Sequence, residues 1–149
     1  ANAKLAPTFT RWVTNTDSCP PHPNQLAVVE ALNASQAPSE KMAEIFHQRR
    51  EKIVAGLNEI PGFECQSPGG AFYVWPNVTE ACKIVGAKDS EEMRKRLLYE
   101  AGVAVLADIH FGSRVEGDGE HLRFSYASSF EAINEGLSRI QEFMKKNKR

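Results

Sequence analysis

Hydrophobic side chains recur at helical spacing along much of the chain. The longest such stretch runs from residue 39 to about residue 60, where apolar positions return every three or four residues until Pro61-Gly62 interrupts the pattern. Two more helices are predicted where polar capping residues precede apolar positions, after Asp89-Ser90 and after Ser128-Ser129-Phe130-Glu131, which has the form of a capping box. Shorter helical patterns cover residues 24–33 and 80–84.

Stretches with a period of two, or rich in aromatic and β-branched residues, predict strands. In residues 121–129, Leu122, Phe124 and Tyr126 alternate with polar or small residues, which predicts a strand with one apolar face. Residues 71–75 are expected to form a strand that is covered on both faces. Further strands are predicted at residues 63–66 and 103–107. The order of elements predicts an α+β fold, a two-layer sandwich in which a small mixed or antiparallel sheet packs against helices.

The first 24 residues show little periodicity. They contain Pro7 and the sequence Cys19-Pro20-Pro21-His22-Pro23, and proline disfavours regular structure within a segment. We therefore expect an extended arm with short ordered pieces over residues 1–24. One domain is expected over residues 25–149, including the long helix at about 39–60, because 149 residues are enough to bury a core.

Composition narrows the classes of function. The net charge is −1 and basic residues are scattered, apart from the run Lys145-Lys146-Asn147-Lys148-Arg149, so nucleic acid and membrane surfaces are not expected partners. No apolar run is long enough to span a membrane, and no secretory leader is visible. The three cysteines form no Cys-x-x-Cys pair and the histidines lack metal-binding spacing. A reducing, cytoplasmic location without a metal site is therefore expected.

Arg123 is the strongest candidate for binding chemistry. It lies in the strand predicted within residues 121–129, on the face opposite Leu122 and Phe124. A strand would hold its guanidinium as a rigid, planar, permanently charged fork, which suits a carboxylate. An arginine exposed on an edge strand, with solvent or a surface acid as its partner, explains the same pattern.

Other motifs give no complete catalytic group. Asp108 and His110 follow a predicted strand and could act together, although a flexible polar loop over residues 108–120 explains them equally well. The chain has no Gly-x-Ser-x-Gly sequence, no Walker loop and no dinucleotide-binding fingerprint. The residues alone thus support an α+β domain with a candidate carboxylate site.

Several segments together resemble one enzyme family. In order along the chain they are Asp17-Ser18-Cys19, Gln25-Leu26-Ala27, Glu30-Ala31-Leu32, Arg49-Arg50, Pro61-Gly62-Phe63, Pro68-Gly69-Gly70-Ala71-Phe72-Tyr73, Gly102-Val103-Ala104-Val105, Phe111-Gly112 and Leu122-Arg123-Phe124-Ser125-Tyr126-Ala127. This series is similar to the C-terminal small domain of class I, fold-type I pyridoxal-phosphate aminotransferases of the aspartate type. It covers nearly the whole chain.

The resemblance implies a specific role for Arg123. In such enzymes the arginine of this last motif binds the α-carboxylate of the amino-acid substrate through two parallel hydrogen bonds. The implied reaction is amino transfer between an amino acid and a 2-oxo acid, with aspartate and 2-oxoglutarate as the first pair by analogy. The arm over residues 17–23 resembles a segment near the neighbouring subunit's active site, which implies a homodimer of the full-length enzyme.

The chain also departs from the family pattern. No lysine stands in the context of the family's cofactor-binding lysine, so the resemblance implies that pyridoxal 5'-phosphate belongs to the full-length enzyme and is not bound by this part. The expected partner is a missing N-terminal large domain, and no catalytic residue is expected here. Ala107-Asp108 also stands where many relatives have Pro-Gly. The alternative is a stand-alone amino-acid-binding or regulatory module.

Overall fold

The computed structural model describes residues 2–115 and 117–148. The chain divides into two compact units, Ala1–Glu40 and Lys41–Arg149, and each is described by itself. Helix α3 (Ala37–Asn58) passes from the first unit into the second. The domain bounds expected from the sequence, residues 1–24 and 25–149, stay a prediction.

The first unit is helical where an extended arm was expected. It contains α1 (Ala6–Thr16) and α2 (His22–Asn33). Helix α1 tolerates Pro7 because the proline stands in the first turn, where the missing N–H has no intrahelical partner to lose. The hydroxyls of Thr10 and Thr14 donate to carbonyls four residues earlier, at 3.0 and 2.8 Å.

No residue of α1 or α2 is buried. Their apolar side chains therefore face outward; the large exposed ones in this unit are Leu5, Phe9, Trp12, Val13, Leu26, Val28, Val29 and Leu32. Most of the apolar surface of this unit has no partner among the described residues.

The second unit is built on a three-stranded antiparallel sheet. Its strands are β1 (Tyr73–Val74), β2 (Leu106–Ala107) and β3 (Leu122–Ser125), in the order β1-β3-β2. The predicted α+β fold with a small antiparallel sheet is confirmed. The strands are shorter than predicted, and residues 63–66 contribute only a bridge between Glu64 and Asn77.

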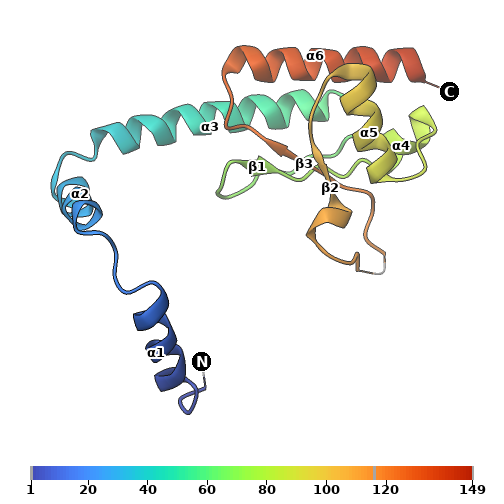
Figure 1. Cartoon of the computed structure of the whole chain (residues 1–149). Helices are drawn as coiled ribbons and strands as arrows, with labels where there is room; N and C mark the ends of the chain where they lie inside the picture. Colours follow the sequence, from blue (N-terminus) through green and yellow to red (C-terminus); the bar gives the residue numbers. More distant parts are fainter. Residues whose placement is uncertain (1, 116, 149) are drawn as a thin grey trace. The chain divides into compact units, whose positions relative to one another are not determined.

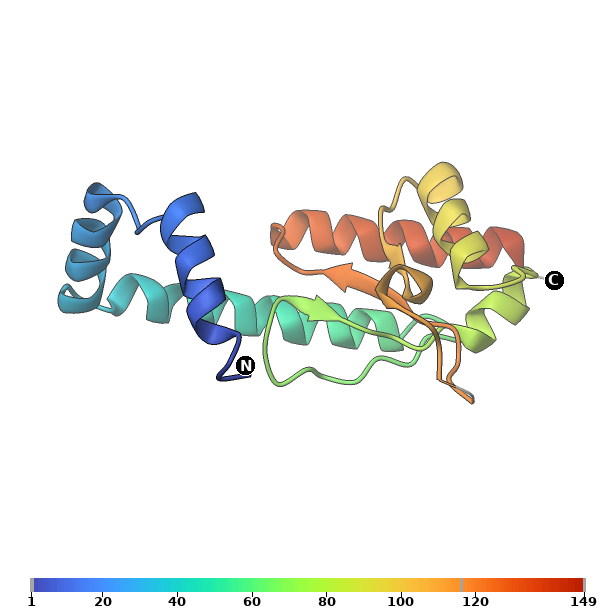
Figure 2. The same cartoon turned by 60° about the horizontal axis from the view of Figure 1, so that its bottom comes forward.

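Helices α3 and α6 (Phe130–Asn147) lie side by side over one face of this sheet (Figures 1 and 2). The two helices meet at Gly56, where an added Cβ atom would lie 2.4 Å from Leu137 Cδ1, so a larger residue there would force the Leu137 side chain to move. Only one sheet face is covered in this way. The expectation that residues 71–75 are covered on both faces is therefore wrong: Trp75 is 42% exposed.

The remaining helices start and end at residues suited to capping. Helix α5 (Ser90–Ala101) begins where the Asp89 carboxylate accepts a hydrogen bond from the Glu92 N–H at 2.8 Å. Helix α6 is capped by Ser129, whose hydroxyl oxygen accepts from the Ala132 N–H at 3.2 Å. The cap thus lies one residue later than the predicted capping box. The short helix α4 (Thr79–Val85) and the 3₁₀ turn η1 (Asp108–Phe111) complete the unit.

The core lies between the sheet and the helices. Its largest fully buried side chains are Tyr126, Leu57, Ile60, Met93, Leu97, Leu122 and Ile140. They come from β3, the segment after it, the helices α3, α5 and α6, and the turn after α3, which places β3 at the centre of the packing. Within residues 2–115 and 117–148, no helix combines the length and the apolar character needed to cross a membrane.

Candidate functional site

Strand β3 presents its side chains to two different surroundings. Leu122 and Phe124 face the core and are 0% and 6% exposed, as the alternating pattern predicted. Arg123 lies on the other face, opposite Leu106 of β2 in the antiparallel register. Since β3 is the central strand, the alternative of an arginine on an edge strand is excluded.

Two aromatic rings hold the Arg123 guanidinium. Its Cζ atom is 4.2 Å from the ring centroid of Tyr73 in β1 and 4.7 Å from that of Phe111 at the end of η1. The two rings come from the segments on either side of β3. Cation–π contacts of this kind fix the position of a guanidinium without using its N–H donors.

Among the described residues, no side chain or carbonyl accepts a hydrogen bond from Arg123, and no carboxylate lies within 4.0 Å of its nitrogens. A surface acid partner is therefore not found in that part of the chain. Arg123 is only partly buried, so part of the residue is accessible to a ligand. The side chain can offer a planar pair of donors to a carboxylate.

The aromatic surface continues beyond Arg123. Trp75 contacts the Phe111 ring edge-on, with centroids 5.3 Å apart, and stacks on His121 at 5.8 Å. Trp75 and Phe111 are 42% and 49% exposed. We call Tyr73, Trp75, Phe111 and His121 the aromatic ledge. Two of its rings, Tyr73 and Phe111, lie against the guanidinium and exclude water from part of it, which strengthens an ionic contact made there.

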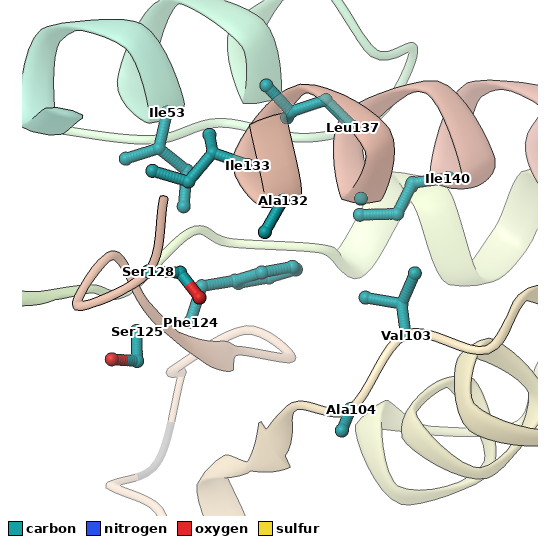
Figure 3. A pocket seen from close by; sticks show the side chains of 11 residues that line it. Ile53, Val103, Ala104, Phe124, Ser125, Ser128, Ala132, Ile133, Leu137 and Ile140 are labelled. Atoms are coloured by element: carbon teal, nitrogen blue, oxygen red, sulfur yellow. The ribbon is translucent and has the colours of Figure 1, made fainter. Parts of the chain in front are cut away.

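A pocket of about 260 Å³ lies on the opposite, core-facing side of β3. Figure 3 shows Phe124 lying below α6, with Ser128 and Val103 at its two ends. No charged side chain lines this pocket, and Arg123 takes no part in it. A carboxylate would therefore find no countercharge there.

Asp108 and His110 do not act as a pair. Asp108 is 7% exposed, and its carboxylate accepts hydrogen bonds from Arg114, Ser90 and the Ile109 N–H. The His110 Nδ1 atom instead lies 3.0 Å from the Ala107 carbonyl oxygen. The polar residues of the loop are therefore structural partners of one another, and a catalytic dyad is not formed.

Other reactive groups are not arranged for chemistry. Burial raises the pKa of the Cys65 thiol to about 11 and that of Cys82 to about 12, so neither is a thiolate near neutral pH. In the described ranges, no three His, Cys, Asp or Glu side chains are grouped so that they could hold a metal ion. Arg123 remains the candidate.

The sequence did not reveal Tyr73 and Phe111 as neighbours of Arg123, nor Arg114 as a partner of Asp108. The first pair depends on the strand order, which alternation within one strand does not fix. The second depends on how the loop folds back. Opposite charges six residues apart, at Asp108, Arg114 and Glu120, were the available signal.

Comparison with known proteins gives consistent matches. Residues 2–140 match the family described as aminotransferase class I and II. The chain is 39% identical over 139 residues to an aspartate aminotransferase of Bacillus subtilis, and the match covers 93% of this chain and 34% of that protein. It is 38% identical over 122 residues to an asparagine–oxo-acid transaminase of Streptococcus mutans, covering 82% of this chain and 30% of that protein.

Solved structures give the same result. The crystal structure of an aspartate aminotransferase from Rhizobium meliloti superposes with a TM-score of 0.82 at 31% identity, covering 95% of this chain and 36% of the other. An alanine aminotransferase from Pyrococcus furiosus also reaches 0.82, at 27% identity, covering 97% and 36%. The chain therefore spans about a third of the length of these relatives.

Proposed function

Because this chain belongs to the family of class I and II aminotransferases, we propose that it is the C-terminal, substrate-carboxylate-binding part of a pyridoxal-phosphate aminotransferase. The full-length enzyme transfers an amino group between an amino acid and a 2-oxo acid. The observation that carries the proposal is Arg123, whose guanidinium is held by Tyr73 and Phe111 while no described residue accepts its hydrogen bonds. Its role is to bind the α-carboxylate of the substrate.

The geometry favours a carboxylate over other ligands. A guanidinium presents parallel N–H donors that match the two oxygens of a carboxylate, and the rings restrict how the donors can turn. A ligand fixed by two hydrogen bonds to one rigid group is oriented as well as bound. Arg123 would therefore set the direction of the bonds at the substrate's α-carbon.

Pyridoxal phosphate does not fit the residues of this chain alone. The cofactor supplies an electron sink for carbanion chemistry and is held in such enzymes through a lysine. Every lysine here is exposed: Lys4, Lys41, Lys52, Lys83, Lys88, Lys95, Lys145, Lys146 and Lys148. Lys83 and Lys95 contact the surface acids Glu80 and Glu91. We therefore assign the cofactor to a part of the enzyme outside these residues.

A missing large domain fits the first unit of the chain. The chain matches about a third of its relatives' length, and α1 and α2 have no buried residue. Exposed apolar surface of this kind is typical of an interface. We propose that the N-terminal large domain and a second subunit cover it in a homodimer. A cytoplasmic location is part of the proposal, and the unpaired cysteines support it.

The substrate pair follows from the relatives. Three aspartate aminotransferases are among the relatives that match most of this chain, at 36–39% identity, so aspartate and 2-oxoglutarate are proposed first. Specificity for the substrate's side chain depends on residues beyond Arg123, because the α-carboxylate is common to all amino acids.

The test is Arg123→Lys in the full-length protein. Lysine keeps the positive charge but cannot donate two parallel hydrogen bonds to a carboxylate. KM for the amino-acid substrate should therefore rise about tenfold to a hundredfold, which corresponds to the free energy of one hydrogen bond to a charged group. Arg139→Lys on α6 is the matched control, because Arg139 pairs with Glu135 at the surface. Kinetic constants that Arg123→Lys leaves unchanged for every amino acid would contradict the assignment. Binding of amino acids without transamination would favour a stand-alone module.

A further inference from the structure

One guanidinium closes the base of the loop between β2 and β3. Arg114 Nε lies 2.6 Å from Asp108 Oδ2, and Nη2 lies 3.0 Å from Oδ1 of the same carboxylate. The same side chain donates to both carboxylate oxygens of Glu120. Its Nη2 also donates to Ser90 Oγ at 2.9 Å. Arg114 thus joins the start of η1, the end of the loop and the first turn of α5.

This cluster is buried at its centre and fully hydrogen-bonded. Asp108 and Ser90 are 7% and 0% exposed, and the Ser90 hydroxyl donates to Asp108 Oδ1 at 2.6 Å. Buried ionic groups add little stability compared with apolar residues of similar size. The geometry of this cluster, however, admits few alternatives, because loss of the contact with Arg114 would leave the buried Asp108 carboxylate without a countercharge.

The cluster fixes the turn that carries Phe111. Asp108 is the first residue of η1, and its Oδ1 atom accepts a hydrogen bond from the Ile109 N–H at 2.8 Å. Phe111 is the last residue of η1 and is 49% exposed. Core packing therefore does not hold its ring. The position of the ring above Arg123 depends on the backbone of η1.

We propose that Asp108, Ser90 and Arg114 are positioning residues that fix η1, so that Phe111 holds the Arg123 guanidinium in place for a substrate carboxylate. This proposal rests on the proposed role of Arg123. Its physical basis is preorganisation: a binding group that is already held in its bound position loses less conformational freedom when the ligand arrives.

The first experiment measures the position of Phe111 without any substrate. The chain has two tryptophans, Trp12 and Trp75, and Trp75 contacts the Phe111 ring. In a Trp12→Phe background, the fluorescence and acrylamide quenching of Trp75 therefore report on η1. Arg114→Lys keeps the positive charge but removes the planar set of N–H donors of the guanidinium. We expect a shifted emission maximum and a larger quenching constant for Arg114→Lys, and neither change for the control Arg139→Lys.

A second variant protects the test against loss of folding. Ser90→Ala removes one hydroxyl and keeps every charge, so it should shift the Trp75 signal in the same direction with far-UV circular dichroism unchanged. If Arg114→Lys does not fold, Ser90→Ala alone decides the outcome. Trp75 fluorescence and quenching equal to the parent in a folded variant would overturn the proposal.

The second experiment separates this proposal from the function it rests on. In the full-length enzyme, Arg114→Lys should raise KM for the amino-acid substrate by roughly tenfold, the effect of a small misplacement of a binding group, with kcat within about twofold. If Arg123→Lys raises KM and Arg114→Lys does not, the positioning role is refuted and the carboxylate site stands. If neither variant changes KM, the carboxylate site itself fails, and the positioning role fails with it.

Discussion

Replacing Arg123 with alanine should lower the free energy of unfolding of this chain by only a modest amount. The guanidinium loses two cation–π contacts, with Tyr73 and Phe111, and each is worth about 0.5–1 kcal/mol at a partly exposed site. No ion pair with a described residue is lost. The expected loss is therefore about 1–2 kcal/mol in total, which corresponds to a fall in Tm of roughly 2–8 °C for a chain of this size.

Arg114→Ala is the contrasting variant. It leaves the carboxylate of Asp108, which is 7% exposed, and that of Glu120 without their guanidinium partner. Removing one member of a buried ion pair costs about 3–5 kcal/mol, although the partial exposure of Arg114 places the expected loss near the lower end, at about 3 kcal/mol. The two arginines lie close in sequence, but they should differ clearly in their contribution to stability.

The assay is urea unfolding followed by circular dichroism at 222 nm, with the free energy obtained by linear extrapolation. A ligand-binding arginine predicts a small effect for Arg123→Ala and a large one for Arg114→Ala. A loss of more than about 3 kcal/mol for Arg123→Ala would show that Arg123 has a structural ionic partner, and the reasoning about its free donors would be refuted.

Three further predictions concern the core, a turn and the response to acid. Leu57→Ala, at a side chain that is 0% exposed, should lower the free energy of unfolding by about 2–5 kcal/mol in urea unfolding. Gly62→Ala should lower the unfolding midpoint, because Gly62 has a φ of +82° and an added Cβ would lie 2.4 Å from the Ala81 nitrogen. Burial raises the pKa of Asp108, but hydrogen bonds from Arg114 and Ser90 outweigh it and hold that pKa below the ordinary 3.8. Its contribution to stability is therefore present above that value and is lost as the pH falls further, so thermal unfolding of Asp108→Asn should depend less on pH below about pH 4.

The elements that could be predicted from the sequence are those with a strong local pattern and a buried face. Helices α3, α5 and α6 were expected close to their observed bounds, because their apolar positions follow the helical period and polar residues mark their ends. The alternation of β3 likewise predicted which of its side chains face the core. In each case one short stretch of sequence contains the whole signal.

Helix α1 shows why the first unit was harder to predict. Phe9, Trp12 and Val13 are spaced like one face of a helix, but all three are exposed within their own unit. Proline and threonine in the same stretch favour other conformations locally, and they obscured the spacing. The apolar face of α1 is expected to pack on residues outside this chain. Nothing within the sequence therefore accounts for the helical spacing of its apolar residues.

The candidate site also has one part that could be predicted from the sequence and one part that could not. The face from which Arg123 projects follows from local alternation, whereas its neighbours follow from which strands pair with β3. Phe111 reaches the guanidinium only because η1 turns back after β2, and η1 depends on contacts among Ser90, Asp108 and Arg114 that no local pattern specifies. The direction of Arg123 on β3 could thus be predicted from the sequence. The arrangement of the aromatic rings around it could not, because it depends on a charge cluster that joins the two ends of a loop. The fluorescence of Trp75 tests this dependence directly, since the indole contacts the ring that we propose the cluster positions.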